Sequence, residues 1–204
     1  MALRLRFRVA RMQGKTALAL ETVRLLVKHR AMAKTNGASL SRALALELLF
    51  AAKDPAQVAQ AWSTLEASER AMTDVALGAA RHWLALGGDA AQSRLWLLPV
   101  WERMAQQPKE LTQAQRRQLV RTIESGFAQQ DGTPDAAWLA RIEAAQMADP
   151  RDALLQYLAG VMCARLSLWG KAQHLFRQSV AITTDLELKR DAQRALDAVV
   201  QRRD

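Results

Sequence analysis

Residues 153–182 read ALLQYLAGVMCARLSLWGKAQHLFRQSVAI, and this stretch decides the fold class. Two runs of apolar side chains at helical spacing are separated by a short break, which predicts a pair of antiparallel helices. Gly160 and Ala172 are small enough to let the two helices approach closely, and Phe176 is placed to fill the space beyond them. The stretch therefore predicts a helical hairpin that packs on a neighbouring hairpin.

Signals for helix ends recur along the rest of the chain. Asp54, Thr133 and Asp149 each place a capping side chain before a proline, which loses nothing at a first helical position. Gly37 stands where a helix is expected to stop. Strand signals are almost absent, and nine glycines and five prolines are too few for a sandwich or barrel. We therefore predict an all-α chain. The expected helices are 2–12, 15–30, 39–52, 55–66, 73–86, 89–107, 111–130, 134–148, 151–166, 169–182 and 185–203.

The hairpin pattern recurs at a spacing of 34 residues. Gly126 stands where Gly160 stands one period later, and Ala145 and Pro150 keep the same register. This pattern resembles a degenerate form of the tetratricopeptide repeat. The resemblance implies a single domain over residues 1–204, built as a right-handed superhelical stack of antiparallel helix hairpins (an α-solenoid). The concave side of such a stack is commonly a binding surface.

Positive charge is concentrated at the N-terminal end of the chain. The sequence has 29 Lys and Arg against 20 Asp and Glu, a net charge of +9. Residues 1–34 hold nine basic side chains and one acidic side chain, Glu21, so they supply +8 of that total. A protein that is basic over its whole surface would distribute this charge more widely. Either this end meets an anionic partner, or a preceding segment of a longer chain balances it.

Four of these cations share one face of the first predicted helix: Arg4, Arg8, Arg11 and Lys15. In the repeat register the three arginines point into the concave groove. Guanidiniums there could fork onto carboxylates of a protein segment or of a propionate-bearing ligand. The alternatives are a solvated face and a face covered by a preceding hairpin. Apolar side chains flank the cations, with Leu5, Val9 and Met12 in an adjoining strip and Leu3, Phe7 and Ala10 on the far side.

A second candidate surface is apolar. Ile123, Phe127, Tyr157 and Val161 fall at groove-facing positions of the repeat, with Arg165 at the edge. An exposed apolar groove usually binds a partner. A final helix that packs there would explain the same pattern equally well.

No catalytic constellation is present in the sequence. Nucleotide-binding glycine motifs, the zinc-protease motif and the nucleophile elbow are all missing. The three histidines lie far apart, and none has a His or Cys at metal-ligand spacing. Cys163, the single cysteine, is expected to be a buried and inert thiol, and the six tryptophans are expected to fill the core. We therefore predict a protein that is not an enzyme and has no resident metal or cofactor.

Five blocks of the sequence carry a more specific resemblance. They are RVARMQG at 8–14, WLLPVWE at 96–102, DAAWLARIE at 135–143, LQYLAG at 155–160 and LWGKAQ at 168–173. Together they resemble the HemY proteins of proteobacteria over nearly the whole chain. HemY-type proteins are inner-membrane proteins associated with late steps of protohaem synthesis, and two hydrophobic N-terminal segments precede their tetratricopeptide-containing soluble part. The chain lacks such segments, so we expect it to correspond to the soluble C-terminal part.

The resemblance and the grooves together lead to one expected function and two alternatives. We expect a scaffold that binds protein partners, among them enzymes of haem synthesis, near the bacterial inner membrane. The first alternative is direct binding of haem or another porphyrin through the basic groove, as a carrier or sensor. The second is contact of the basic end with anionic lipid. Nucleic-acid binding is not expected, because Phe7 is the only aromatic residue within the basic stripe.

Overall fold

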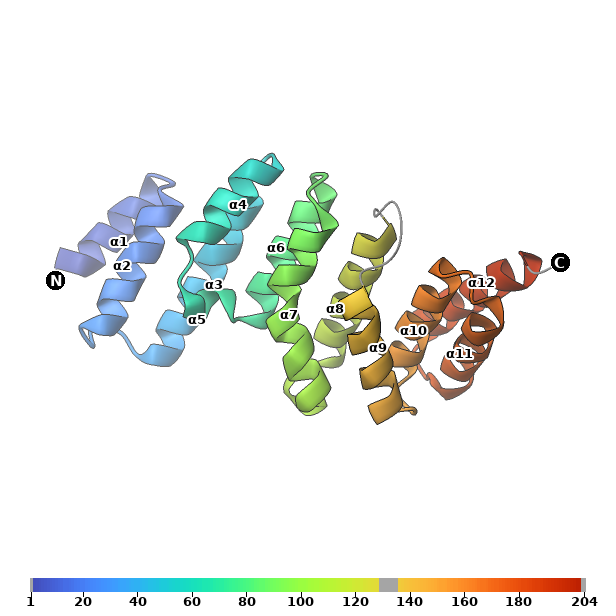
Figure 1. Cartoon of the computed structure of the whole chain (residues 1–204). Coiled ribbons are helices and arrows are strands. Elements are labelled where there is room, and N and C mark those ends of the chain that lie inside the picture. Colours follow the sequence, from blue (N-terminus) through green and yellow to red (C-terminus); the bar gives the residue numbers. More distant parts are fainter. Residues whose placement is uncertain (1, 129–135, 203–204) are drawn as a thin grey trace. The chain divides into compact units, whose positions relative to one another are not determined.

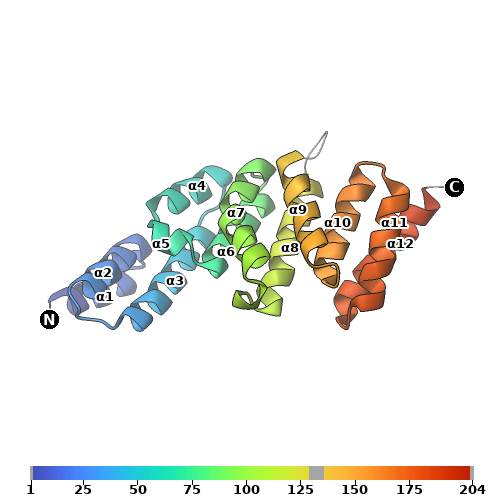
Figure 2. The same ribbon diagram turned by 60° about the horizontal axis from the view of Figure 1, so that its bottom comes forward.

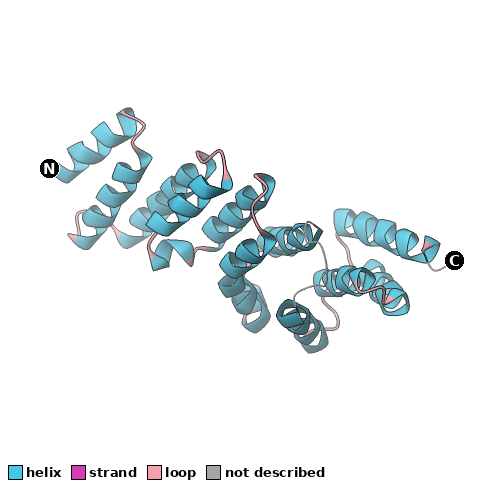
Figure 3. Cartoon of the chain, turned by 45° about the horizontal axis from the view of Figure 1, so that its top comes forward, coloured by secondary structure: helices cyan, strands magenta, loops and turns pink. Residues whose placement is uncertain are grey.

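The structure is a computed structural model that describes residues 2–128 and 136–202, and Figure 3 shows helices and loops without a strand in those ranges. The all-α prediction is therefore confirmed for the described residues, and the fold is compatible with an α-solenoid. The helices are α1 (Ala2–Met12), α2 (Thr16–Lys28), α3 (Lys34–Phe50), α4 (Pro55–Thr64), α5 (Ala67–Arg70), α6 (Thr73–Ala85), α7 (Ala90–Gln106), the 3-10 helix η1 (Pro108–Glu110), α8 (Gln113–Ala128), α9 (Ala136–Ala148), α10 (Ala153–Arg165), α11 (Trp169–Ile182) and α12 (Leu186–Gln201).

The contacts group the helices into two compact units. The first extends to Arg103 and the second begins at Met104, so the division falls near the end of α7.

In the first unit, consecutive helices pack side by side (Figure 1). Helix α2 contacts α1 and α3, and α3 also contacts α4, α5 and α6. Leu20, Val23 and Leu49 are among the apolar side chains that form the buried core. The ring of Trp62 stacks on that of Trp96, with centroids 4.8 Å apart. These two tryptophans are packing residues, as the sequence predicted.

A largely buried ion pair ties α2 to α5. The guanidinium of Arg24 forks onto the carboxylate of Glu69, with N–O distances of 2.9 and 2.5 Å. Glu69 is only 2% exposed, and it also accepts a hydrogen bond from the backbone N–H of Glu66 at 2.9 Å, which closes a capping box. The hydrogen bond to Glu69 is the main cause of a raised pKa for Arg24. The carboxylate of Glu69 is thus hydrogen-bonded on both of its oxygens, and the pair joins α2 to α5.

In the second unit, α10 is the central helix (Figure 2). It contacts α8, α9, α11 and α12, and α11 also packs on α12. The largest fully buried side chains of the second unit include Phe127, Ile142, Leu158 and Phe176. A Cβ added at Gly160 of α10 would lie 2.7 Å from Cε1 of Phe176 on α11. The close approach expected from Gly160 is therefore present in the hairpin formed by α10 and α11.

Arginines of α8 bind the N-terminal caps of later helices. Arg116 contacts Asp152, the N-cap residue of α10, and Arg117 contacts Asp185, the N-cap residue of α12. Each aspartate also accepts hydrogen bonds from the first backbone N–H groups of its own helix. The N-termini of α8, α10 and α12 are thus joined by charged hydrogen bonds, which are stronger than neutral ones.

The helix bounds differ from the predicted ones at identifiable residues. Helix α3 begins at Lys34 rather than at 39, because Gly37 lies inside its first turns and does not end the preceding helix. Gly37 is buried where a Cβ would collide with Val27 of α2, so the glycine serves close packing of two helices. The short helices α5 and η1 were not predicted, because so few residues carry no periodic pattern. The expected cap at Thr133 and the expected helix ends at 130, 134 and 203 lie outside the described residues.

Candidate partner-binding sites

The four cations that were predicted to share one helix face lie in different environments. They are Arg4, Arg8, Arg11 and Lys15. Arg4 and Arg8 line a shallow hollow of about 690 Å³ whose apolar lining includes Phe7, Met32 and Leu40. The Nη2 group of Arg4 also donates a hydrogen bond to the backbone carbonyl of Ala31 at 3.1 Å. Arg8 makes no ion pair with a described residue, so its guanidinium is available to a partner.

Arg11 is already engaged by the protein. Its Nη1 group donates to both carboxylate oxygens of Glu47 on α3, at 2.8 and 2.6 Å. The hydroxyl of Thr16 donates to the same carboxylate at 2.6 Å. These hydrogen bonds, with Thr16 the larger contributor, lower the pKa of Glu47. Lys15 lies in the turn before α2 and is exposed. Of the four predicted residues, Arg4 and Arg8 line one hollow, whereas Arg11 and Lys15 do not.

The predicted apolar residues also divide into two groups. Phe127, Val161 and Arg165 line a common hollow of about 550 Å³ in the second unit. Ile123 and Tyr157 do not line this hollow and are buried in the core.

Tyr157 belongs to a polar network behind the hollow. Its hydroxyl donates to Oε1 of Glu124 at 2.6 Å and accepts from Nη1 of Arg121 at 3.0 Å. The ring is 3% exposed, and burial is the main cause of a pKa well above the ordinary value for tyrosine, followed by the hydrogen bond to Glu124. A phenol in this setting stays neutral and fixes α8 against α10.

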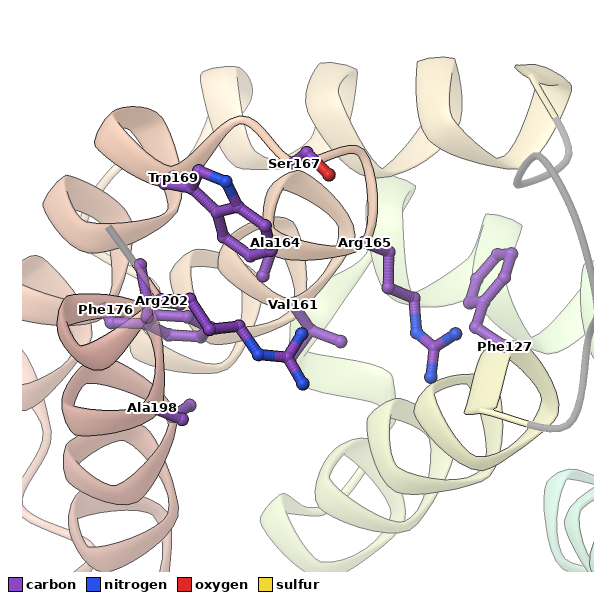
Figure 4. Close-up of a pocket in the computed structure, with 11 residues that line it drawn as sticks. Phe127, Val161, Ala164, Arg165, Ser167, Trp169, Phe176, Ala198 and Arg202 are labelled. Atoms are coloured by element: carbon purple, nitrogen blue, oxygen red, sulfur yellow. The ribbon is translucent and has the colours of Figure 1, made fainter. Parts of the chain in front are cut away.

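The hollow has walls that sequence reasoning missed. Figure 4 shows the side chains of Arg165 and Arg202 extending into it on either side of Val161, with Trp169 along one wall. The final helix, α12, contributes Ala195, Ala198 and Val199, and its C-cap residue is Arg202. The alternative of a final helix that covers this surface is therefore met only in part, because α12 forms one side of the hollow and leaves it open. Trp169 was visible in the repeat pattern, but no sequence signal placed Arg202 beside it.

The charge of this hollow is entirely positive over the described chain. Arg165 and Arg202 are its charged lining residues, and no described lining residue is acidic. The guanidinium carbon of Arg202 lies 5.9 Å from the centre of the Trp169 ring, within the range of a cation–π contact. Neither arginine makes an ion pair with a described residue. The hollow can therefore accept a carboxylate on its guanidiniums and an apolar group on its walls.

The described chain holds one buried thiol and no cluster of metal-ligating side chains. Cys163 is buried, and burial is the main cause of a raised pKa for its thiol, which disfavours the reactive thiolate. No group of three His, Cys, Asp or Glu side chains among the described residues could hold a metal ion. No described helix is long and apolar enough to cross a membrane.

Comparisons of the chain with protein-family models, curated proteins and solved structures gave no match.

Proposed function

We propose that the chain is a non-catalytic scaffold of the HemY type, whose second unit binds protein partners from late protohaem synthesis at the bacterial inner membrane. The hollow lined by Phe127, Val161, Arg165, Trp169 and Arg202 is the observation that carries this proposal. A protein segment that places an acidic side chain beside an apolar one matches both kinds of lining. The sequence blocks that resemble HemY proteins supply the link to haem synthesis.

We propose a tetratricopeptide-like, right-handed superhelical stack for this scaffold, and the contacts of α10 support the stacking of its hairpins. In that architecture the first helices of successive hairpins contact one another, and each hairpin packs its two helices closely. Helix α10 contacts both α8 and α12, and it also contacts α11 of its own hairpin. The hollow opens beside these helices, where such stacks commonly bind their partners.

The scaffold acts by raising effective concentration. A protein that holds successive enzymes together converts their second encounter into an intramolecular one. A reactive and poorly soluble porphyrin can then pass between the enzymes with less loss to the surroundings. This action needs no catalytic residue on the chain itself.

Capture of haem-synthesis enzymes from detergent-solubilised bacterial membranes tests the proposal. The immobilised chain is compared with the Arg165→Glu/Arg202→Glu variant, which reverses the charge of the hollow. Arg177→Glu/Arg190→Glu is the matched control, because both residues are exposed on the same unit and make no ion pair with a described residue. The proposal predicts enrichment that the first variant loses and the control keeps. Enrichment no greater than on an unrelated helical-repeat protein would contradict it.

Direct porphyrin binding is the second candidate function, and the contact of Arg202 with Trp169 favours it. The two guanidiniums of the hollow could pair with propionates while the macrocycle lies on the aromatic wall. This candidate predicts a saturable shift of the Soret band on titration with haemin or coproporphyrin, weakened in Arg165→Glu/Arg202→Glu. A parallel titration of Arg4→Glu/Arg8→Glu asks whether the α1 hollow binds instead. A linear response in every variant would mean nonspecific adsorption.

A further inference from the structure

The outward face of α1 carries a strip of exposed apolar side chains. Leu5, Val9 and Met12 are 64%, 42% and 88% exposed, and their spacing places them on one side of the helix. The opposite side packs inward, where Ala10 is fully buried and Phe7 packs against the core. The strip therefore has no partner within the described part of its unit.

Cations border this strip on both sides. At 100° per residue, Arg4 and Arg8 fall along one edge of the strip and Arg6 along the other. Arg6 lies 3.2 Å from Glu21, but both side chains of that pair remain substantially exposed, so water and salt weaken it. Helix α1 itself contains no acidic residue. The face thus combines a narrow apolar ridge with positive charge along its length.

The hollow beside the strip offers further hydrogen-bond donors. Asn36 and Ser39 line it together with Arg4 and Arg8, and no described lining residue is acidic. Guanidinium, amide and hydroxyl groups of this kind can all donate to phosphate oxygens. The α1 face therefore pairs a surface that suits acyl chains with a polar cradle that suits a phosphate group.

We propose that this α1 face docks on an anionic phospholipid surface. Leu5, Val9 and Met12 enter the boundary between headgroups and acyl chains, while the bordering arginines remain at the level of the phosphates. Charge complementarity selects this occupant, because α1 carries four arginines and no acidic residue, and anionic leaflets attract such segments. A second copy of the chain would present the same positive charge and be repelled. This surface is separate from the hollow of the second unit, so it does not depend on the proposed scaffold function.

The first test measures binding of the full chain to vesicles by co-sedimentation. Vesicles of phosphatidylcholine with about one third phosphatidylglycerol are compared with vesicles of pure phosphatidylcholine. We expect binding to the anionic vesicles that falls at high salt, and little binding to the neutral ones. Equal binding to both kinds of vesicle, or binding to neither, would overturn the proposal.

Two pairs of variants separate the charge of the face from its apolar strip. Arg4→Gln/Arg8→Gln should weaken binding about 30-fold, since each basic residue near the surface contributes roughly fivefold. Leu5→Ser/Met12→Ser should also weaken it, because those two side chains enter the bilayer. All four residues are exposed, so circular dichroism should show an unchanged fold.

Matched substitutions on the second unit serve as controls. Arg177→Gln/Arg190→Gln removes two exposed cations, and Met147→Ser/Leu186→Ser removes two apolar side chains that are 74% and 70% exposed. Neither control should change vesicle binding. A loss as large in the controls as in the α1 variants would overturn the proposal. Full binding by Leu5→Ser/Met12→Ser would also overturn it, because α1 would then only adsorb through charge. Crosslinking of α1 to a membrane protein without any vesicle binding would assign the face to a protein partner instead.

Discussion

A methyl group added at Gly160 should destabilise the second unit, and the structure gives the size of the effect. The new Cβ of Gly160→Ala would lie 2.7 Å from Cε1 and 2.8 Å from Cδ1 of Phe176, closer than real Cβ contacts. Phe176 is 1% exposed and also lines the hollow of the second unit, so its ring can yield only toward that hollow and at the cost of its present packing. Overpacking of this kind costs about 1–3 kcal/mol. The higher helix propensity of alanine stabilises the helix by about 0.8–1 kcal/mol. The free energy of unfolding should therefore fall by roughly 0–2 kcal/mol.

Gly170→Ala is the matched control for this variant. Gly170 lies in the first turn of α11, and a Cβ there would meet nothing within 4 Å. The propensity gain is therefore similar and the overpacking cost is absent. The difference in unfolding free energy between the two variants isolates the close approach of α10 and α11, and it should be about 1–3 kcal/mol.

Urea denaturation followed by circular dichroism and tryptophan fluorescence measures this difference. Hydrogen exchange of the α10 and α11 amides locates it within the second unit. Phe176→Leu should cost less stability in the Gly160→Ala background than alone, because the smaller side chain makes room for the methyl group. A Gly160→Ala protein as stable as Gly170→Ala would refute the close packing of this hairpin.

Three further predictions concern single side chains. Tyr157 is the only tyrosine, so absorbance near 295 nm reports the ionisation of its phenol alone. Burial and the hydrogen bond to Glu124 raise the pKa of Tyr157. The phenol should therefore stay neutral above pH 10 while the protein is folded. Its contribution to stability is then present below about pH 10 and is lost as the pH rises further, and titration at the ordinary tyrosine pKa of about 10 would contradict the buried network. Ser167, which follows α10, has a φ of 57°, a conformation that glycine adopts without strain. Ser167→Gly should therefore raise the free energy of unfolding by about 1 kcal/mol, which raises the urea midpoint. A lowered midpoint would contradict a strained turn. Glu69→Gln should lower the free energy of unfolding by about 1–3 kcal/mol, because Arg24 loses its buried charge partner. An unchanged free energy of unfolding would mean that this pair is exposed to solvent.

Local signals in the sequence predicted the helices well. The bounds of α1 and α11 match the predicted ranges 2–12 and 169–182, since helical periodicity and turn residues are properties of neighbouring positions. The N-cap role of Asp54 was also predicted, and its side chain accepts from the backbone N–H of Gln57. Gly37 was misread, because a glycine that ends a helix and a glycine that admits a neighbouring helix look alike in one sequence.

The repeat register placed some candidate site residues and not others. Phe127 and Val161, which are 34 residues apart, were predicted to share a repeat position, and both line the same hollow. Ile123 and Tyr157 share a position too, but that position faces the core. Arg11 was predicted to be available to a partner, but it forms an ion pair with Glu47. These two residues are far apart in the sequence, so no local pattern could predict their contact.

The far wall of the hollow lay beyond sequence reasoning for a different reason. Arg202 reaches Trp169 only because α12 packs on α11 and α10 at one particular register. That register depends on the shapes of buried side chains from three helices. A single sequence shows that α12 is amphipathic, but not where its last turn ends in space.

The most direct test of the scaffold proposal is crosslinking from inside the hollow. Cys163 is the only cysteine and is buried, so a cysteine introduced at the exposed lining position in Ala198→Cys can carry a thiol-reactive photocrosslinker without competing labelling. The same probe in Arg177→Cys on α11 is the control. We expect haem-synthesis enzymes of solubilised membranes to crosslink to position 198 and not to 177, and Arg165→Glu/Arg202→Glu to abolish the product. Crosslinks to these enzymes that are absent, or equally frequent from both positions, would contradict the proposal.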